Sequence, residues 1–158
     1  MASANIDSFK IRPGSRKISG KVKGRELTFT IPEPQKLYIE INGLPHLAIF
    51  ANPLEVNPPK QGDPGVVYFG PGAHNPGQIT LQSNQTIYIA GGAIVTANVR
   101  GADLRNVKIS GRGSLQGNVR ITGTSNLDVN GIFIRNTKGW SNTLTNCRHC
   151  SYRNVKVF

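Results

Sequence analysis

The stretches VYFGPGAH (residues 67–74) and IYIAGGAI (residues 87–94) carry nearly the same pattern, with Ile87 in the place of Val67. The same step along the chain leads to VKISGRGS at 107–114 and LDVNGIFI at 127–134, and a slightly longer step leads to a weaker copy, CSYRNVKV, at Cys150. A period of about 20 residues, without a leucine-rich consensus or helical spacing, predicts a β-solenoid. One coil of a solenoid cannot bury its own apolar face, whereas a stack of coils can.

Equivalent positions of successive coils are expected to form inward columns of apolar side chains. Asn98-Val99-Arg100 recurs as Asn118-Val119-Arg120, and the recurrence of Asn106 as Asn126 predicts an amide ladder at a corner, where φ must be positive. The expected columns are Val67, Ile87, Val107 and Leu127; Phe69, Ile89, Ile109 and Val129; and, in a second strand, Ile79, Val99 and Val119.

Residues 8–50 show a different pattern, in which apolar and polar residues alternate in short runs between turn signals such as Asn42-Gly43. This pattern predicts antiparallel strands. The stretch 52–65 contains four prolines, which fix φ and lack an amide donor, so it predicts an extended connector. We therefore expect an all-β chain: a small β-sandwich over residues 1–57, a proline-rich linker over 58–65, and a right-handed parallel β-helix of about four to five coils over 66–158, within which the chain ends.

The chain of 158 residues has 19 Lys and Arg against 8 Asp and Glu, a formal net charge of +11. This charge favours an acidic partner, although a solvated basic surface would look the same. The basic residues are dispersed and no nucleic-acid-binding motif occurs, so we do not expect a nucleic acid partner. No apolar run reaches the roughly 18 residues of a membrane helix, so no membrane partner is expected. The opening stretch, MASANIDSFK, lacks the apolar segment of a signal peptide.

Few residues in the repeat region suggest catalysis. Its only carboxylates are Asp103 and Asp128, which are offset by five positions in the repeat, and Asp128 alternates with inward residues and should point outward. Cys147 and Cys150 are spaced C-x-x-C, but a second ligand pair and a following helical pattern are both missing. We therefore expect no catalytic residue, no metal site and no cofactor in this chain.

Four residues are candidates for binding. Arg100 and Arg120 should stack one coil apart, and an anionic ligand would relieve their repulsion, although two splayed and solvated arginines would do so too. Trp140 is the only tryptophan and lies in the insertion that lengthens the last step. Its apolar ring suits stacking against a sugar, with Asn142 near enough for a polar contact; packing against the next coil is the alternative.

The runs FANPLEVNPP, GDPGVVYFGPGAHNPGQITLQSNQTIYIAGGAIV and NVKISGRGSLQG resemble the front portion of pectin-lyase-like glycoside hydrolases. The likeness is to the dextranase and isopullulanase group (family 49) and the polygalacturonases (family 28). NGIFIRNTKGWSNTLTNCRHCSYRNVKVF resembles the coils before their catalytic segment. The resemblance implies inverting hydrolysis of a polysaccharide and a secreted or periplasmic location. The Asp-Gly-Ile-Asp-like stretch and Asp-Asp pair of those families do not occur here, so no catalytic residue is carried over.

Three hypotheses follow. The chain is the N-terminal part of a polysaccharide-degrading glycoside hydrolase, inactive by itself. Alternatively, it is a non-catalytic basic solenoid that binds an anionic polysaccharide. The third hypothesis is a scaffold that self-associates through an open end of the β-helix.

Overall fold

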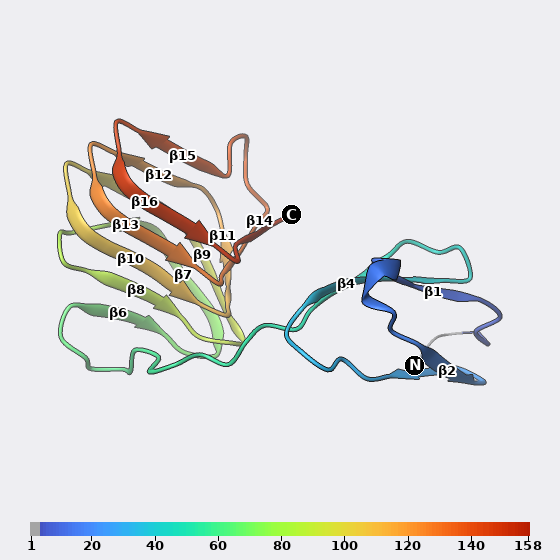
Figure 1. The fold of residues 1–158 in the computed structure, drawn as a ribbon. Helices are drawn as coiled ribbons and strands as arrows, with labels where there is room; N and C mark the ends of the chain where they lie inside the picture. The colour runs from blue at the N-terminus through green and yellow to red at the C-terminus, as the bar shows by residue number, and fades with distance from the viewer. Residues whose placement is uncertain (1–3) are drawn as a thin grey trace. The chain divides into compact units, whose positions relative to one another are not determined.

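A computed structural model describes residues 4–158, so the first three residues of the expected domain 1–57 lie outside the described part. Strands account for 54% of the chain and helices for 2%, and a few antiparallel strands precede a solenoid of about five parallel coils. The expected all-β fold class is confirmed. The chain divides into two compact units, one ending at Leu54 and the other formed by Glu55–Phe158 (Figure 1).

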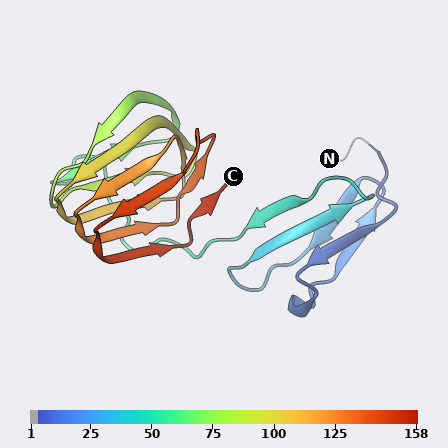
Figure 2. The same ribbon diagram turned by 90° about the horizontal axis from the view of Figure 1, so that it is seen from above.

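The N-terminal unit contains two small antiparallel sheets (Figure 2). Strand β4 lies between β1 and β5, and β2 pairs with β3. A Cβ added to Gly20 would lie 2.8 Å from Leu27 Cδ1 and 3.1 Å from Phe9 Cε2, so side chains of the two sheets pack closely there. The elements are β1 (Phe9–Arg12), a 3-10 turn η1 (Gly14–Arg16), β2 (Gly20–Lys23), β3 (Glu26–Phe29), β4 (Lys36–Ile41) and β5 (Leu47–Phe50).

The solenoid unit is built from two parallel sheets that face each other across its core. In the first sheet β6, β8, β10, β13 and β16 stack in chain order, from green to red in Figure 1. In the second sheet β7 pairs with β9. Residues 94–96 of β9 then pair with β11, which continues to β14 and β17, and residues 99–102 of β9 pair with β12, which continues to β15. The strands are β6 (Val66–Phe69), β7 (Gly72–Thr80), β8 (Thr86–Ile89), β9 (Ala93–Ala102), β10 (Arg105–Gly111), β11 (Ser114–Gln116), β12 (Val119–Thr122), β13 (Ser125–Asn130), β14 (Phe133–Arg135), β15 (Asn142–Thr145), β16 (Arg148–Arg153) and β17 (Lys156–Val157).

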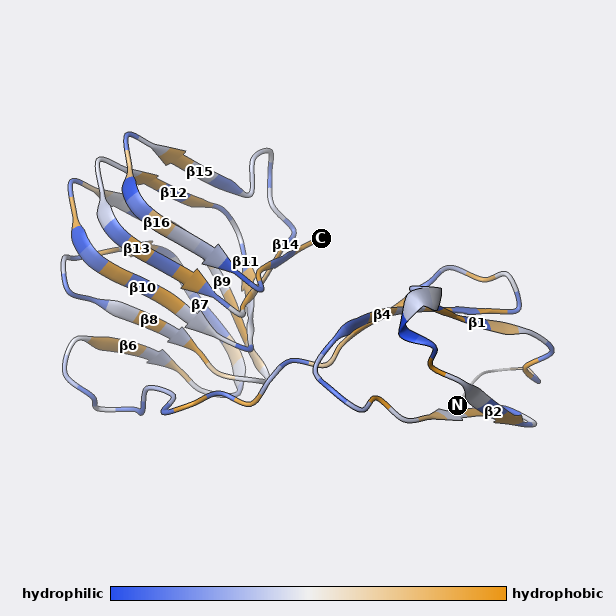
Figure 3. Cartoon of the chain, viewed as in Figure 1, coloured by the Kyte–Doolittle hydropathy of each residue, from blue (hydrophilic) through white to orange (hydrophobic). Residues whose placement is uncertain are grey.

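The interior of the solenoid is one apolar core. Apolar and polar positions alternate along its strands (Figure 3), because successive side chains of a strand point to opposite faces. Val67 and Phe69 of the first coil are partly buried against the core. The other residues of the expected columns are at most 8% exposed: Ile79, Ile87, Ile89, Val99, Val107, Ile109, Val119, Leu127 and Val129.

One expected alignment between coils is wrong. Ile87 pairs with Ile109, not with Val107, and Ile89 pairs with Gly111, not with Ile109. The corner between Thr80 and Thr86 is two residues shorter than the corresponding corners of the next two coils. A shift of two residues leaves every side chain on its original face, so the apolar pattern could not reveal it. Six other pairs are confirmed: Val67–Ile87, Phe69–Ile89, Val107–Leu127, Ile109–Val129, Ile79–Val99 and Val99–Val119.

The expected amide ladder is confirmed and is longer than predicted. Asn126 Nδ2 donates to Asn106 Oδ1 at 2.9 Å, and Asn106 Nδ2 donates to Asn84 Oδ1 at 2.9 Å. All three residues have positive φ, between 54° and 61°, which asparagine tolerates better than most side chains. His149, with φ 52°, occupies the next position of this corner.

Candidate functional site

A groove runs over the outside of the solenoid where β9 passes from one partner strand to another. Residues 94–96 of β9 pair with β11, and residues 99–102 pair with β12. The groove at this transition has a volume of about 310 Å³. We call it the β9 groove; its lining residues are Gly77, Thr96, Ala97, Asn98, Arg100, Gln116, Gly117, Asn118, Asn136 and Lys138.

The floor of the β9 groove depends on small residues. Gly117 has φ 147°, and a Cβ at this position would overlap the backbone carbonyl of Ala97 in the coil below. The coils therefore approach each other closely at this corner.

Arg100 supplies a fixed cation to the groove. Its Nη1 donates to the carbonyl of Val99 at 3.0 Å and to that of Asn118 at 3.4 Å, and the residue is half-buried. A guanidinium carries five N–H donors in a planar fork, so the bonds made by Nη1 leave the fork's other donors to meet a carboxylate or sulfate.

Asn118 holds the loop that forms one wall of the groove. This loop joins β14 to β15 and is four residues longer than the segment between Gln116 and Val119 one coil below. Asn118 is 6% exposed, and its Nδ2 donates to the carbonyls of Lys138 at 3.1 Å and Trp140 at 2.5 Å. Its backbone N–H donates to Asn98 Oδ1 at 3.1 Å. Two side-chain amides thus fix the position of Lys138 beside Arg100.

The four residues selected from the sequence lie at different distances from this groove. Arg100 and Arg120 pair directly in register, but only Arg100 lines the groove, and Arg120 is exposed on β12. Trp140 lies in the wall loop and is 80% exposed. Asn142 begins β15; its Nδ2 donates to Ser141 Oγ at 3.3 Å, and its buried Oδ1 has no partner among residues 4–158.

Sequence reasoning missed the amide residues and the lysine of the groove. Asn98 and Asn118 stood beside the two arginines in the repeated phrase, so the signal for them was present. Lys138 could not be found in this way, because its loop has no counterpart in the other coils.

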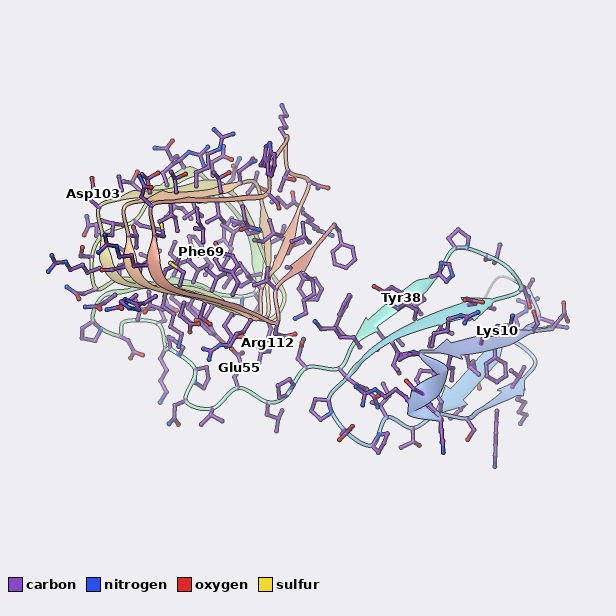
Figure 4. The ribbon with its side chains drawn as sticks, turned by 45° about the horizontal axis from the view of Figure 1, so that its top comes forward. Lys10, Tyr38, Glu55, Phe69, Asp103 and Arg112 are labelled. Atoms are coloured by element: carbon purple, nitrogen blue, oxygen red, sulfur yellow. The ribbon has the colours of Figure 1, made fainter. Side chains whose placement is uncertain are left out.

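The two carboxylates of the repeat region do not lie in the groove. Asp128 points outward from β13, as expected, and both its oxygens bind Arg153 Nη2, at 2.9 and 3.1 Å. Asp103 is exposed at the corner between β9 and β10, where its φ is 52° (Figure 4). A glycosidase places two carboxyl groups on either side of one bond. The lining of the groove therefore presents amides and cations, but it contributes no carboxylate for acid–base chemistry.

The structure shows no metal-binding cluster among residues 4–158, as no group of three His, Cys, Asp or Glu side chains converges there. Cys147 and Cys150 are both free thiols. Residues 4–158 also contain no helix of the length and apolarity that a membrane span requires.

A second polar cluster joins the connector to the solenoid. Tyr88 donates its hydroxyl to Glu55 Oε2 at 2.9 Å, and Arg112 Nη1 lies 3.8 Å from Glu55 Oε1. Figure 4 shows Glu55 and Arg112 side by side on the outside of the coils. Burial, followed by the hydrogen bond and charge of Glu55, raises the pKa of Tyr88 to about 12. Tyr88 also stacks on Tyr68, with ring centroids 5.4 Å apart. Tyr88 is buried, Glu55 and Arg112 are partly buried, and the three side chains contact one another, so we interpret this cluster as structural.

The N-terminal unit has a basic concavity of its own, of about 500 Å³, lined by Arg16, Lys17 and Lys21 among others. Arg16 is directed to Glu33, at 3.4 Å. No side-chain amide contributes to this lining. This concavity therefore lacks the amide hydrogen bonds of the β9 groove, and its lysines are suitable for control substitutions.

Comparison with known proteins finds a likeness in structure but not in sequence family. No protein-family model matches the chain, and no curated protein does. Among solved structures, the chain is similar to a crystal structure of a "putative glycosyl hydrolase" from Parabacteroides merdae ATCC 43184, with a TM-score of 0.57 and 16% sequence identity. The match covers 59% of this chain and 59% of the other, so the chain spans less than two thirds of that protein. At this identity the likeness is one of fold, and the fold is a β-solenoid of a kind found in a protein named as a glycosyl hydrolase.

Proposed function

We propose that this chain binds an acidic polysaccharide along the β9 groove, as part of a carbohydrate-active β-helix protein of the glycoside hydrolase kind. The observation that carries this proposal is the lining of the groove, in which Arg100 and Lys138 lie among side-chain amides and no carboxylate is present. Amides both donate to and accept from sugar hydroxyls, and a guanidinium binds uronate or sulfate groups in a fork.

The repetition of the groove supports a polymer rather than a single sugar. Asn98, Asn118 and the loop that carries Lys138 belong to three successive coils, which are about 4.8 Å apart. A chain lying along the stack would meet similar groups at each coil. Trp140, beside Lys138 in the wall loop, offers an exposed apolar face against which a pyranose ring can stack.

The test is binding to polygalacturonate and alginate, compared with neutral dextran, by calorimetry at two salt concentrations. We expect binding to the acidic polymers only, weakening as salt rises because exposed charges are screened. The double variant Arg100→Gln/Lys138→Gln should weaken binding about tenfold or more, since each charge-assisted hydrogen bond contributes about 1.5–3 kcal/mol.

A matched control removes the same charge elsewhere. Arg105 and Arg148 are exposed at another corner of the coils, and Arg105→Gln/Arg148→Gln lowers the net charge by the same amount. Lys17→Gln/Lys21→Gln does so in the concavity of the N-terminal unit. If either control weakened binding as much as the groove variant, attraction by general charge would replace the proposal.

Hydrolysis by a protein of the dextranase or polygalacturonase kind is the second candidate, supported by the fold likeness and by the resemblance of the sequence. We propose that the chain by itself lacks this activity, because Asp103 and Asp128 face different surroundings. Release of reducing ends from dextran, pullulan and polygalacturonate measures it. Release that disappears in Asp103→Asn or Asp128→Asn would contradict the proposed inactivity.

Self-association is the third candidate, and its support is the exposure of Leu144, Val157 and Phe158 in the last coil, at 38%, 51% and 60%. Sedimentation velocity at rising concentration tests it. A dimer abolished by Val157→Lys would favour assembly, and a monomer throughout would exclude it.

A further inference from the structure

At the corner that carries the amide ladder, one residue before the ladder asparagine and one residue after it point inward, and this holds in two successive coils. Val107 and Leu127 follow the ladder residue, pair directly and are 1% exposed. Leu104 and Thr124 precede the ladder corner; Leu104 packs on the core and Thr124 is fully buried. Each of these two coils therefore brings two side chains, three positions apart in the chain, to the inner side of one corner.

In the last coil both of these positions are cysteines. Cys150 pairs with Leu127, and Arg148 pairs with Ser125, so that Cys147 falls at the position of Thr124. Cys147 packs against the core, with its Sγ 3.6 Å from the carbonyl of Ile121. His149 takes the exposed ladder position between them, with φ 52°.

The two thiols lie at this one corner, where Cys147 is partly buried and Cys150 is exposed. They are close enough for Cys147 to act electrostatically on Cys150. Burial raises the pKa of Cys150, and the charge and hydrogen bond of Cys147 add to this rise.

We propose that Cys147 and Cys150 are a modification site that accepts an intramolecular disulfide from a small disulfide oxidant such as glutathione disulfide. One thiolate attacks a sulfur of the oxidant, forming a mixed disulfide and releasing one glutathione thiolate. The second cysteine thiolate then attacks the protein sulfur of the mixed disulfide and releases the second glutathione. Two electrons pass to glutathione, and the two thiol protons end on the two glutathione molecules released. This site is independent of polysaccharide binding.

The test measures the equilibrium between the native chain and a glutathione redox buffer, with the chain in urea as reference. Cys147 and Cys150 are the only cysteines, so a thiol count falling from two to none reports the reaction directly. Because the fold holds the sulfurs together, the equilibrium constant for oxidation should be about tenfold higher, or more, in the native chain than in urea. Equal constants, or a lower native constant, would overturn the proposal.

Intact mass separates the remaining outcomes. The expected product is a monomer that has lost two hydrogen atoms. Cys147→Ser and Cys150→Ser should each give only a mixed disulfide with glutathione, and their circular dichroism spectra check that they fold. A stable glutathione adduct on the native wild-type chain, or a disulfide-linked dimer, would contradict the assignment. Slower amide hydrogen exchange in β16 after oxidation would show that the bridge forms within the folded corner.

Discussion

At the scale of single residues, the corners of the solenoid allow few substitutions. Gly111 has φ 128°, and a Cβ there would overlap the backbone of Ile89 in the coil below. Gly91, by contrast, has room: its Cβ would meet only Arg112 Cβ, at 3.8 Å. Two glycines at the same position of the sequence repeat therefore face different constraints, and the difference arises from packing between coils.

We expect Gly111→Ala to destabilise the solenoid by at least about 2 kcal/mol, since it combines backbone strain with a clash against a main-chain carbonyl. Gly91→Ala should change the free energy of unfolding by less than about 1 kcal/mol. Urea unfolding followed by circular dichroism measures both. Similar effects at the two positions would mean that the coils are not packed as described.

The amide ladder gives a second prediction for a single residue. Asn106→Gly keeps the left-handed backbone accessible but removes the bonds to Asn84 and Asn126, and it should cost about 1–2 kcal/mol. Asn146 also has positive φ, of 51°, and is exposed at the end of β15. Asn146→Gly is therefore the matched control and should be nearly neutral in the same unfolding experiment.

At the scale of elements, the sequence repeat predicted the strands and their inward faces well, because burial imposes a period of two that composition reveals. It predicted the asparagines of one corner but not the lengths of the corners. The shift that pairs Ile87 with Ile109 preserves the apolar pattern, so only the length of the Thr80–Thr86 corner determines it. The contact between Glu55 and Tyr88 was also out of reach, since it joins a connector to a strand 33 positions away.

The contact between Tyr88 and Glu55 predicts how the free energy of unfolding depends on pH. The raised pKa of Tyr88, about 12 against 10 for a free tyrosine, means that the folded chain favours the neutral hydroxyl. Stability should be fully present below pH 10 and fall between pH 10 and pH 12. Burial raises the pKa of Tyr152 to about 12 as well, so both tyrosines contribute to this fall.

Unfolding in urea at pH 9, 10 and 11 should show the wild-type chain losing stability on the order of 2 kcal/mol. Tyr88→Phe should have a lower free energy of unfolding at pH 9, because the hydrogen bond to Glu55 is gone. Its free energy of unfolding should then decrease less than that of the wild type as pH rises. Tyr152→Phe should be neutral or stabilising at pH 7, because the Tyr152 hydroxyl is buried without a partner. A pH profile of Tyr88→Phe parallel to that of the wild type would contradict the role given to this cluster.

At the scale of the whole molecule, each compact unit has a core of its own. Leu37 and Ile39 are buried in the N-terminal unit, and the columns described above fill the solenoid. The sequence pattern also changes near this division, although the N-terminal part was expected to extend to residue 57. It indicated the groove only through Arg100, because the groove depends on amides from several coils and on a loop without an equivalent.

The separate cores predict that the solenoid unit, Glu55–Phe158, folds without the N-terminal unit. The fragment should keep a β-type circular dichroism spectrum and a cooperative unfolding transition. Its affinity for acidic polysaccharide should lie within about threefold of the full chain, because every residue of the β9 groove is present. A tenfold loss would show that the N-terminal unit takes part in binding.

The parallel pairs of the solenoid join positions at a nearly constant separation along the chain, from Ser114 with Phe133 to Leu127 with Cys150. Each added coil therefore closes a loop of nearly the same length and loses nearly the same chain entropy, however tall the stack becomes. A folded coil exposes strand edges with which the next coil can pair. Folding can therefore nucleate at any coil and propagate to its neighbours. Although the chain is all-β, its strand pairs have short sequence separations. We therefore expect the solenoid to fold faster than an all-β fold with strand pairs that are distant in sequence.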